Sequence, residues 1–287
     1  CCVTLINQRL DAVAELVAKD ARRSELRKLL RQVPDMERLL GKIVYGTATP
    51  KDLASLRSGC NILPDVAAII SDLPATERMC TPLDPLTNLT TQLCVTLVDD
   101  PPVSAREGGL IRPGYNAEID HLKQLAQGGK QWVAELEARE RERTGIKSLK
   151  VGYNKVFGYY LEVTKANLAN VPADYIRRQT LVGSERYITP ELKEREAEIL
   201  GAQERLNQLE YEVFAQLCQH VAAEAATLRC TANAIARLDV LVSLAEVATR
   251  YHYVRPDVDD HDIIYLKASR HPVVERLRTN IPFVPND

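Results

Sequence analysis

Cationic and hydrogen-bonding side chains are concentrated between residues 147 and 189 of this 287-residue chain. The basic residues of this stretch are Lys147, Lys150, Lys155, Lys165, Arg177, Arg178 and Arg186, and the acidic ones are Glu162, Asp174 and Glu185. The stretch carries a net charge of +4, which leaves −6 for the rest of a chain whose total is −2. Lysine and arginine neutralise phosphates, and Asn, Ser and backbone N–H groups can hydrogen-bond phosphate oxygens. This chemistry suits a nucleic-acid backbone, although such an excess is also common on a solvated surface.

Four short segments of the same stretch predict a small antiparallel sheet. KSLKVGY, FGYYLEVT, RRQTLVG and ERYIT are rich in β-branched and aromatic residues, which favour strands. We expect the first two strands to be joined through Asn154-Lys155 and the last two through Gly183-Ser184. VPADYI, with Pro172 near its start, is typical of a short helical crossover between the two hairpins.

The aromatic residues of the predicted sheet could either pack or make contacts. Few other large apolar side chains are available to fill the core of so small a sheet. We therefore expect Phe157, Tyr159 and Tyr160 to be buried. The turns between the strands would then make any contact with a ligand.

Helical periodicity dominates the first third of the chain. Residues 5–33 carry apolar side chains at the spacing of amphipathic helices. Further helices are predicted to begin at Pro34-Asp35 and at Pro50, and another to run from Pro82 to Val98. The segment 99–116 holds three prolines and three glycines, so it is predicted to be a connector without helix.

Two long helices flank the predicted sheet, one from about Ala117 to Arg143 and one from Pro190 to about Cys230. A seven-residue apolar repeat, typical of helices packed as in a coiled coil, runs along the second through Leu192, Ile199, Leu206 and Val213. At a rise of 1.5 Å per residue the helices would be about 40 and 60 Å long. Because that exceeds the width of a compact domain, we expect an antiparallel arm with the sheet at its far end.

The last part of the chain is predicted to return to the core. IARLDVLVSLAEVATRYHYV predicts a buried helix, IIYLK a strand, and SRHPVVERLR a turn followed by a short helix. Two histidines could suggest an enzyme. His121 is expected on the surface, while His271 would either border a nucleotide pocket or belong to a turn. No nucleophile, base and orienting residue are recognisable together, so we predict that this chain is not itself an enzyme.

Composition limits the class of protein. The apolar content of 45% and charged content of 26% are ordinary for a globular chain, and no run of eighteen apolar residues predicts a membrane span. The seven cysteines form no C-x-x-C pair, which favours reduced thiols in a cytoplasmic protein over a zinc site. The chain begins Cys1-Cys2 and ends IPFVPND, so we expect a piece of a longer protein.

Several segments resemble the MutS family of bacterial DNA mismatch-repair proteins. LKVGYNKVFGYYLEVT and YIRRQTLVGSERYITPELKEREAEIL closely resemble the family's clamp. RLDAVAEL and VPDMERLLGKIVYGTATPKDL resemble its core helices, and DDPPVSAREGGLIRPGYNAEID resembles its connector into the lever arm. IARLDVLVSLAEVA and SRHPVVE resemble its entry into the ATPase domain. The resemblance is collinear and covers nearly the whole chain.

The resemblance implies a mainly α fold, with a helical core, long antiparallel lever helices and a small antiparallel β-sheet clamp inserted between them. The implied units are a core (1–115), a first lever helix (116–146), a clamp (147–189), a second lever helix with a return helix (190–253) and the start of a linker into an ATPase domain (254–287). The mismatch-reading domain of the family has no counterpart here. The P-loop sequence G-x-x-x-x-G-K-S/T does not occur, so the ATPase domain is also expected to be absent.

The resemblance further implies which residues contact the DNA backbone. Asn154 stands where a family Asn faces the backbone, and Lys155 follows it. Relatives often have Lys-Asn where this chain has Val182-Gly183, so the contact at the second turn is expected from the backbone of Gly183 and Ser184. Lys150, Arg178 and Arg186 are further candidates.

The implied function is non-specific gripping of double-stranded DNA, coupled to an ATPase domain outside this chain. No cofactor, metal or catalytic residue is expected here, while ATP and Mg²⁺ are expected for the full-length protein. The implied partners are DNA, a second copy in a full-length homodimer, and a MutL-type downstream protein, with no membrane. The alternative is a purely structural coiled-coil arm that transmits motion between an ATPase and a partner without touching DNA.

Overall fold

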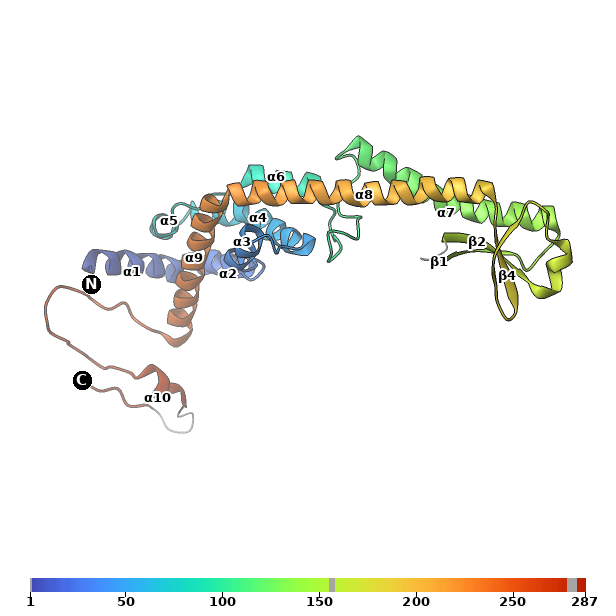
Figure 1. Cartoon of the computed structure of the whole chain (residues 1–287). Coiled ribbons are helices and arrows are strands. Elements are labelled where there is room, and N and C mark those ends of the chain that lie inside the picture. The colour runs from blue at the N-terminus through green and yellow to red at the C-terminus, as the bar shows by residue number, and fades with distance from the viewer. Residues whose placement is uncertain (1, 155–157, 278–282) are drawn as a thin grey trace.

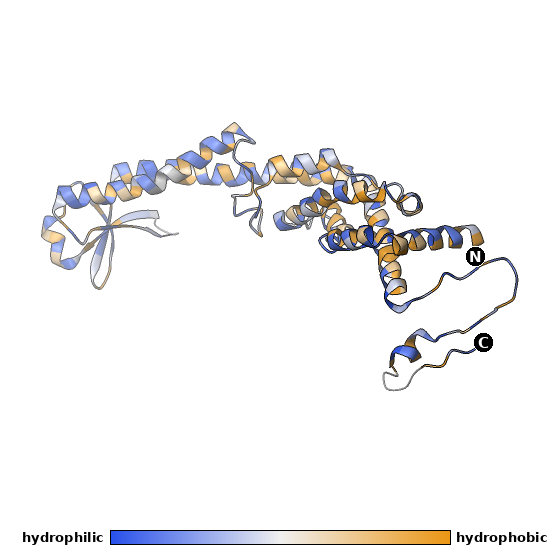
Figure 2. Cartoon of the chain, turned by 180° about the vertical axis from the view of Figure 1, so that it is seen from behind, coloured by the Kyte–Doolittle hydropathy of each residue, from blue (hydrophilic) through white to orange (hydrophobic). Residues whose placement is uncertain are grey.

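The chain folds into a helical body, a long arm and a small sheet at the far end of the arm (Figure 1). The computed structural model describes residues 2–154, 158–277 and 283–287. Hydrophobic residues gather in the helices of the body, whereas hydrophilic ones cover much of the arm (Figure 2). This is the mainly α fold with a small antiparallel sheet that the sequence predicts.

Seven helices build the body. They are α1 (Val3–Ala18), α2 (Asp20–Leu30), α3 (Met36–Val44), α4 (Pro50–Ile70), α5 (Pro74–Cys80), α6 (Thr87–Thr96) and α9 (Ala225–Tyr251). Helix α9 contacts α1, α2, α3 and α5, so it is the central element around which the shorter helices pack. Leu16, Leu53 and Leu238 are among the side chains with no exposed surface in this core.

Polar side chains cap the start of helix α4 and tie the helix to the end of α6. Thr49 and Asp52 form a reciprocal capping box at its start, which satisfies N–H groups that have no partner within the helix. The buried Arg57 donates to the carbonyls of Leu97 and Val98 at 3.0 Å. By length and composition α4 could cross a membrane, but half of its most apolar window is buried inside the body, as in many core helices.

The region predicted as one helix from Pro82 to Val98 is different in the structure. Helix α6 begins only at Thr87, and residues 81–86 separate it from α5. Pro82 and Pro85 have no N–H group to donate within a helix. The carboxylate of Asp84 accepts instead from the N–H of Leu86 at 2.7 Å, which stabilises a turn.

Two long helices form the arm, α7 (Ala117–Thr144) and α8 (Pro190–Ala223). They lie side by side over much of their length (Figure 1). The side chains of Asn116 and Thr189 cap their N-termini, as Asx and Thr residues commonly do. Helix α8 ends at Ala223, earlier than the predicted Cys230, and α9 begins at Ala225. The change of direction brings the apolar residues of α9 into the body.

The sheet has four antiparallel strands in the order β1-β2-β4-β3. The strands are β1 (Lys150–Asn154), β2 (Gly158–Thr164), β3 (Ile176–Thr180) and β4 (Ser184–Ile188). The second predicted turn is wrong in detail, because residues 181–183 connect β3 to β4 and Ser184 already belongs to β4. Of the first predicted turn, Asn154 belongs to β1 and Lys155 lies outside the described residues.

The helical crossover between the hairpins lies earlier than predicted. A 3₁₀ helix spans Lys165–Asn170, and VPADYI follows it without a helix. The residue before a proline is disfavoured in helical conformation. Val171, which precedes Pro172, accordingly has φ −73° and ψ 124°.

The segment after α9 forms no strand at Ile263–Lys267, contrary to the prediction. A strand needs a partner for its backbone groups, and none lies beside this segment among the described residues. The side chain of Ile264 is 88% exposed. The predicted short helix is confirmed as α10 (Pro272–Leu277).

A buried carboxylate joins the arm to the body. Glu210 of α8 has no exposed surface and accepts from the backbone N–H groups of Gly109, Leu110 and Ile111. The ammonium group of Lys123 on α7 lies 2.8 Å from Glu210 Oε1. One side chain therefore holds the connector and both arm helices together.

We expect Glu210→Gln to lower the free energy of unfolding by about 3 kcal/mol or more, because it removes the buried charge that balances Lys123. Denaturant unfolding followed by circular dichroism measures the change. Glu204→Gln, at an exposed position of the same helix, is the control and should change stability by less than about 0.5 kcal/mol. Equal stability of the two variants would contradict a structural role for Glu210.

Gly158 allows the first hairpin to lie against α8. Its φ is +76°, and a Cβ placed there would lie 1.7 Å from Glu196 Oε1. Gly145, at the end of α7, also has a positive φ but open space around an added Cβ. Both Gly→Ala variants should therefore lose about 1–2 kcal/mol from backbone strain.

Gly158→Ala should lose more stability than Gly145→Ala because it also displaces the buried Glu196 carboxylate. Adding Glu196→Ala to each variant removes the obstructing group and should narrow the difference between them. Thermal unfolding of the four variants provides the comparison. A Gly158→Ala variant as stable as Gly145→Ala would show that the hairpin does not need this close approach.

Candidate nucleic-acid interface

One face of the sheet packs on the arm. The shared hydrophobic cluster consists of Leu136, Ile146, Leu149, Leu161, Val163, Tyr175, Tyr187 and Leu192. Strand side chains alternate between the two faces of a sheet. Gly152, Tyr160, Glu162 and Arg186, which are adjacent across β1, β2 and β4, therefore lie on the other face, which we call the outer face.

Tyr160 lies on the outer face, contrary to the prediction that it belongs to the core. Tyr159 packs against the hydrophobic cluster, and consecutive strand residues point to opposite sides. The Tyr160 ring covers Gly152, since a Cβ on Gly152 would lie 2.6 Å from the ring. The guanidinium of Arg186 lies 4.2 Å from the ring centroid, within the range of a cation–π contact. Phe157 lies outside the described residues.

Arg186 and Ser184, two predicted contact residues, are engaged within the sheet. Arg186 Nε donates to Glu162 Oε2 at 3.1 Å, and its Nη1 donates to Gln179 at 3.0 Å. The Ser184 hydroxyl donates to the other oxygen of Glu162 at 3.0 Å. The Arg186 side chain is only 19% exposed. These side chains stabilise the outer face. Ser184 is itself buried, and its carbonyl accepts from the N–H of Leu181 at 2.8 Å.

Lys150, Arg178 and Gly183 are exposed. Among the described residues, neither Lys150 nor Arg178 has an ion-pair partner, so their charges face solvent. Lys147 and Lys165 are also exposed. They lie near the end of the sheet that carries the β3–β4 turn, where Lys165 N donates to the carbonyl of Gly183 at 3.2 Å. Sequence reasoning counted these two lysines but did not select them, because only the strand register shows that they lie near the β3–β4 turn.

The two predicted contact turns lie at opposite ends of the sheet. Asn154 pairs with Gly158 at one end of β2, whereas Ser184 pairs with Thr164 at the other end. At about 3.3 Å per residue the ends of this strand are about 20 Å apart. Asn154 is half-buried, and Lys155 lies outside the described residues. The predicted residues therefore form two separate groups along the sheet.

Two carboxylates of α7, the buried Glu140 and the half-buried Glu137, fix the sheet to this helix. The Tyr175 hydroxyl donates to Glu140 at 2.8 Å, and the Val151 N–H donates to Glu137 at 2.8 Å. Burial, together with Glu140, raises the pKa of Tyr175. Burial and the neighbouring Glu185 raise the pKa of Tyr187 to about 12. Both tyrosines therefore remain neutral hydrogen-bond donors at physiological pH.

The two histidines considered for catalysis lie apart from the sheet's outer face. His121 is exposed on α7. His271 Nδ1 accepts from the N–H groups of Val273 and Val274 at 3.3 and 3.2 Å, so it caps the start of α10. Of the two alternatives for His271, a residue that borders a nucleotide pocket and a residue of a structural turn, this geometry matches the second.

Comparison with known proteins gives the family of the arm and sheet. Residues 114–205, which include α7, all four strands and the first part of α8, match the model for MutS family domain IV. The chain carries a MutS family domain IV. It is 50% identical over 284 residues to the DNA mismatch repair protein MutS of Acetivibrio thermocellus, covering 98% of this chain and 33% of that protein.

Other MutS proteins match over the same extent. The chain is 50% identical over 285 residues to MutS of Symbiobacterium thermophilum and 47% identical over 294 residues to MutS of Methanosarcina barkeri. These alignments cover 98% and 99% of the chain but 32% of each relative. The predicted resemblance to MutS is thus confirmed, and the chain spans about a third of the length of the relatives it matches.

We expect Arg186→Ala to destabilise the MutS domain IV sheet by about 1.5–3 kcal/mol, because it leaves the Glu162 carboxylate without its charged donor. Lys150→Ala should change stability by less than about 0.5 kcal/mol, since its side chain is exposed. Amide hydrogen exchange of the paired strands reports on each variant. Unchanged protection in Arg186→Ala would contradict the structural role assigned to this arginine.

Proposed function

We propose that this chain is the lever and clamp portion of a DNA mismatch-recognition protein, and that its sheet grips duplex DNA non-specifically through the phosphate backbone. In this proposal α7 and α8 are the lever and the sheet is the clamp. The observation that carries it is the group of exposed cations on a sheet held away from the body. The names of the relatives support the connection to DNA mismatch repair.

The division of charge supports contact at the tip of the arm. Lys147, Lys150, Lys165 and Arg178 are exposed there, while the chain outside residues 147–189 is net acidic. An acidic body repels phosphate, so a polyanion would meet the sheet in preference to the body. Lys150 and Arg178 would neutralise phosphates, and the Gly183 backbone could hydrogen-bond them.

The opposite ends of the sheet would contact the same duplex at separate points. Asn154 and Lys155 would act at one end of β2, and the β3–β4 turn with its neighbouring lysines at the other. Contacts to phosphates position a protein on DNA without reading its sequence. This arrangement suits a clamp that holds any duplex.

The remaining parts of the function are proposed for a longer protein. The relatives are about three times as long as this chain, which leaves room for a mismatch-reading domain and an ATPase domain. We propose that such an ATPase would bind ATP and Mg²⁺, and that the lever would link its state to the position of the clamp. A full-length homodimer and a MutL-type partner belong to the same proposal.

A purely structural arm is the second candidate. The engagement of Arg186 and the Ser184 hydroxyl within the sheet favours it, because these side chains serve the fold. The two candidates differ in whether the exposed lysines matter for DNA. The side chains of these lysines have no hydrogen-bond or ion-pair partner among the described residues, so their removal tests contact without disturbing the fold.

We expect the chain to bind a labelled DNA duplex at low salt with a slope of log K against log salt of about −3, as for three or four neutralised phosphates. Lys147→Ala, Lys150→Ala and Lys165→Ala combined should reduce the size of this slope by up to about 2.7, at about 0.9 for each phosphate that is no longer neutralised. Fluorescence anisotropy across a range of salt concentrations measures both. Lys28→Ala, an exposed lysine of α2, is the control and should leave the slope unchanged.

The outcome separates the two candidate functions. If the triple variant binds DNA as the unaltered chain does, or if no binding occurs at low salt, the clamp proposal is wrong. If Lys28→Ala weakens binding as much as Lys150→Ala alone, the contact surface is not confined to the sheet. Thermal unfolding of each variant shows whether its fold is intact.

A further inference from the structure

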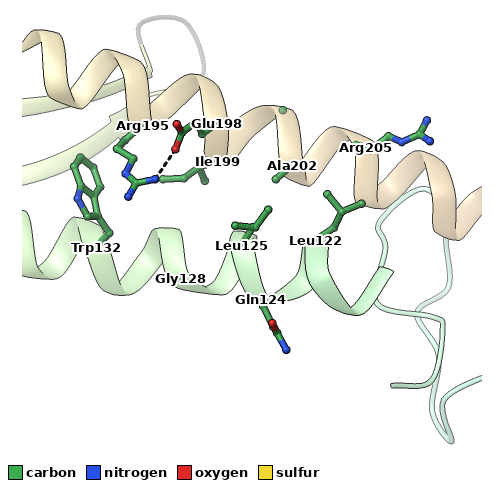
Figure 3. Close-up of a pocket in the computed structure, with 11 residues that line it drawn as sticks. Leu122, Gln124, Leu125, Gly128, Trp132, Arg195, Glu198, Ile199, Ala202 and Arg205 are labelled. Atoms are coloured by element: carbon green, nitrogen blue, oxygen red, sulfur yellow. Dashed lines mark hydrogen bonds and ion pairs between the residues drawn. The ribbon is translucent and has the colours of Figure 1, made fainter. Parts of the chain in front are cut away.

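A cavity of about 620 Å³ lies in the seam between α7 and α8 (Figure 3). Protein pockets that bind small molecules are commonly about 300–1,000 Å³ in volume, and most of their lining is apolar with a few polar groups. The apolar part of the lining here consists of Leu122, Leu125, Trp132, Ile199 and Ala202. The cavity therefore has the size and the composition of a site for a small molecule with an apolar body.

Apolar side chains that neither helix covers face this space. Leu125 points from α7 towards α8, yet it is 48% exposed, and Ile199 of α8 is only half-buried. Gly128 of α7 and Gly201 of α8 also line the cavity, and a Cβ at either position would meet nothing within 4 Å. A ligand in the cavity would remove this apolar surface from water, which is favourable.

A cation and an aromatic ring mark the end of the cavity nearest the sheet. Trp132 and Arg195 both point into the space between the two helices (Figure 3), and Trp132 also packs against the cluster that the sheet shares with the arm. The Arg195 guanidinium donates to Glu198 of its own helix at 2.5 Å. Both side chains of this ion pair are more than half exposed, so it contributes little to stability. A ligand anion can therefore take over the donors of Arg195 without breaking a strong interaction.

The charges around the cavity favour an anion over a cation. Arg195 and Arg205 line it, and Glu198 is the only carboxylate among the described lining residues, so these three side chains carry one net positive charge. Arg205 pairs at 3.4 Å with Glu118 of α7, and both of these side chains are more than half exposed, so solvent screens the pair. A negative group in the cavity gains from the positive excess. Arginine also binds carboxylates and similar anions through charge-assisted hydrogen bonds.

We propose that this cavity binds a small aromatic anion, a carboxylate or sulfonate whose rings lie against Trp132, Leu125 and Ile199 and whose charged group binds Arg195. The rings cover the apolar lining and contact the indole, which favours offset or tilted ring pairs. The anion pairs with the guanidinium, and this contact distinguishes the ligand from an uncharged molecule of the same shape. The inference rests on the seam between the arm helices and does not require that the sheet bind DNA.

Fluorescence tests the proposal, because Trp132 is the single tryptophan of the chain. The probe is anilinonaphthalene sulfonate, an aromatic sulfonate that absorbs light where tryptophan emits it. Its uncharged counterpart is phenylnaphthylamine, which has the same rings and no sulfonate. In a titration of the 287-residue chain, we expect the sulfonate to quench the emission of Trp132 and to fluoresce by energy transfer. For a ligand of about 20 non-hydrogen atoms, the Kd should be on the order of 10–100 µM.

Arg195→Gln isolates the contribution of the charge. It should weaken the binding of the sulfonate about tenfold, as expected for the loss of a charge-assisted hydrogen bond, and change the binding of phenylnaphthylamine by less than about twofold. Arg9→Gln, which replaces an exposed arginine of α1, is the matched control and should change neither affinity. Equal weakening of both dyes by Arg195→Gln would contradict the assignment of the anion to this arginine.

Two further variants act on the apolar lining. Ala202→Phe places a ring beside the cavity at a buried position, and Leu125→Glu adds a charge of the same sign as the ligand, so each should weaken binding of the sulfonate about tenfold or more. Leu5→Glu, at a position of α1 that is 51% exposed, is the control and should leave binding unchanged.

Three results would overturn the proposal. They are the absence of energy transfer from Trp132 in the unaltered chain, transfer that persists undiminished in both Ala202→Phe and Leu125→Glu, and an equal loss in Leu5→Glu. Circular dichroism of each variant shows whether its helices are retained.

Discussion

The buried charge of Glu210 is the constraint on which the geometry of the arm depends. A carboxylate without exposed surface costs several kcal/mol to bury unless donors surround it. Here three backbone N–H groups of the connector and the Lys123 ammonium supply those donors. Charge-assisted hydrogen bonds are also stronger than neutral ones. The connector, α7 and α8 therefore meet in one fixed arrangement, and the direction of the arm follows from it.

The sheet is stable at the end of the arm because it shares a core with the two helices. A small sheet cannot bury enough apolar surface alone, and here Leu136 of α7 and Leu192 of α8 complete its cluster. Glu137 and Glu140 add hydrogen bonds to Val151 and Tyr175. The inner face and the base of the sheet are thus used for attachment. The outer face, the turns and the exposed lysines take no part in this attachment. The basic residues of the stretch 147–189 belong mostly to these surfaces.

Periodicity was enough to predict the mainly α fold, the two long helices and the four strands, because each pattern persists over many residues. It could not predict that α8 ends at Ala223, since no proline or glycine stands there and the packing of α9 in the body decides the break. Tyr160 could have been assigned to the outer face, because it alternates with Tyr159 along one strand. The engagement of Arg186 by Glu162 and the separation of the two turns depend on strand register, which pairs residues far apart in sequence. The absence of a strand at Ile263–Lys267 could not be predicted either. A strand forms only where a neighbouring segment pairs with it, and the sequence of these five residues does not show whether such a segment is present.

The fixed base and the loosely packed middle of the arm have a joint consequence. Glu210 lies only two turns of α8 beyond Ala202, which lines a cavity of about 620 Å³ in the seam between α7 and α8. Moving the arm at its base would separate a buried carboxylate from four donors, whereas moving it at the cavity breaks no interhelical hydrogen bond or ion pair between described residues. The arm is therefore held more firmly at its base than at the cavity.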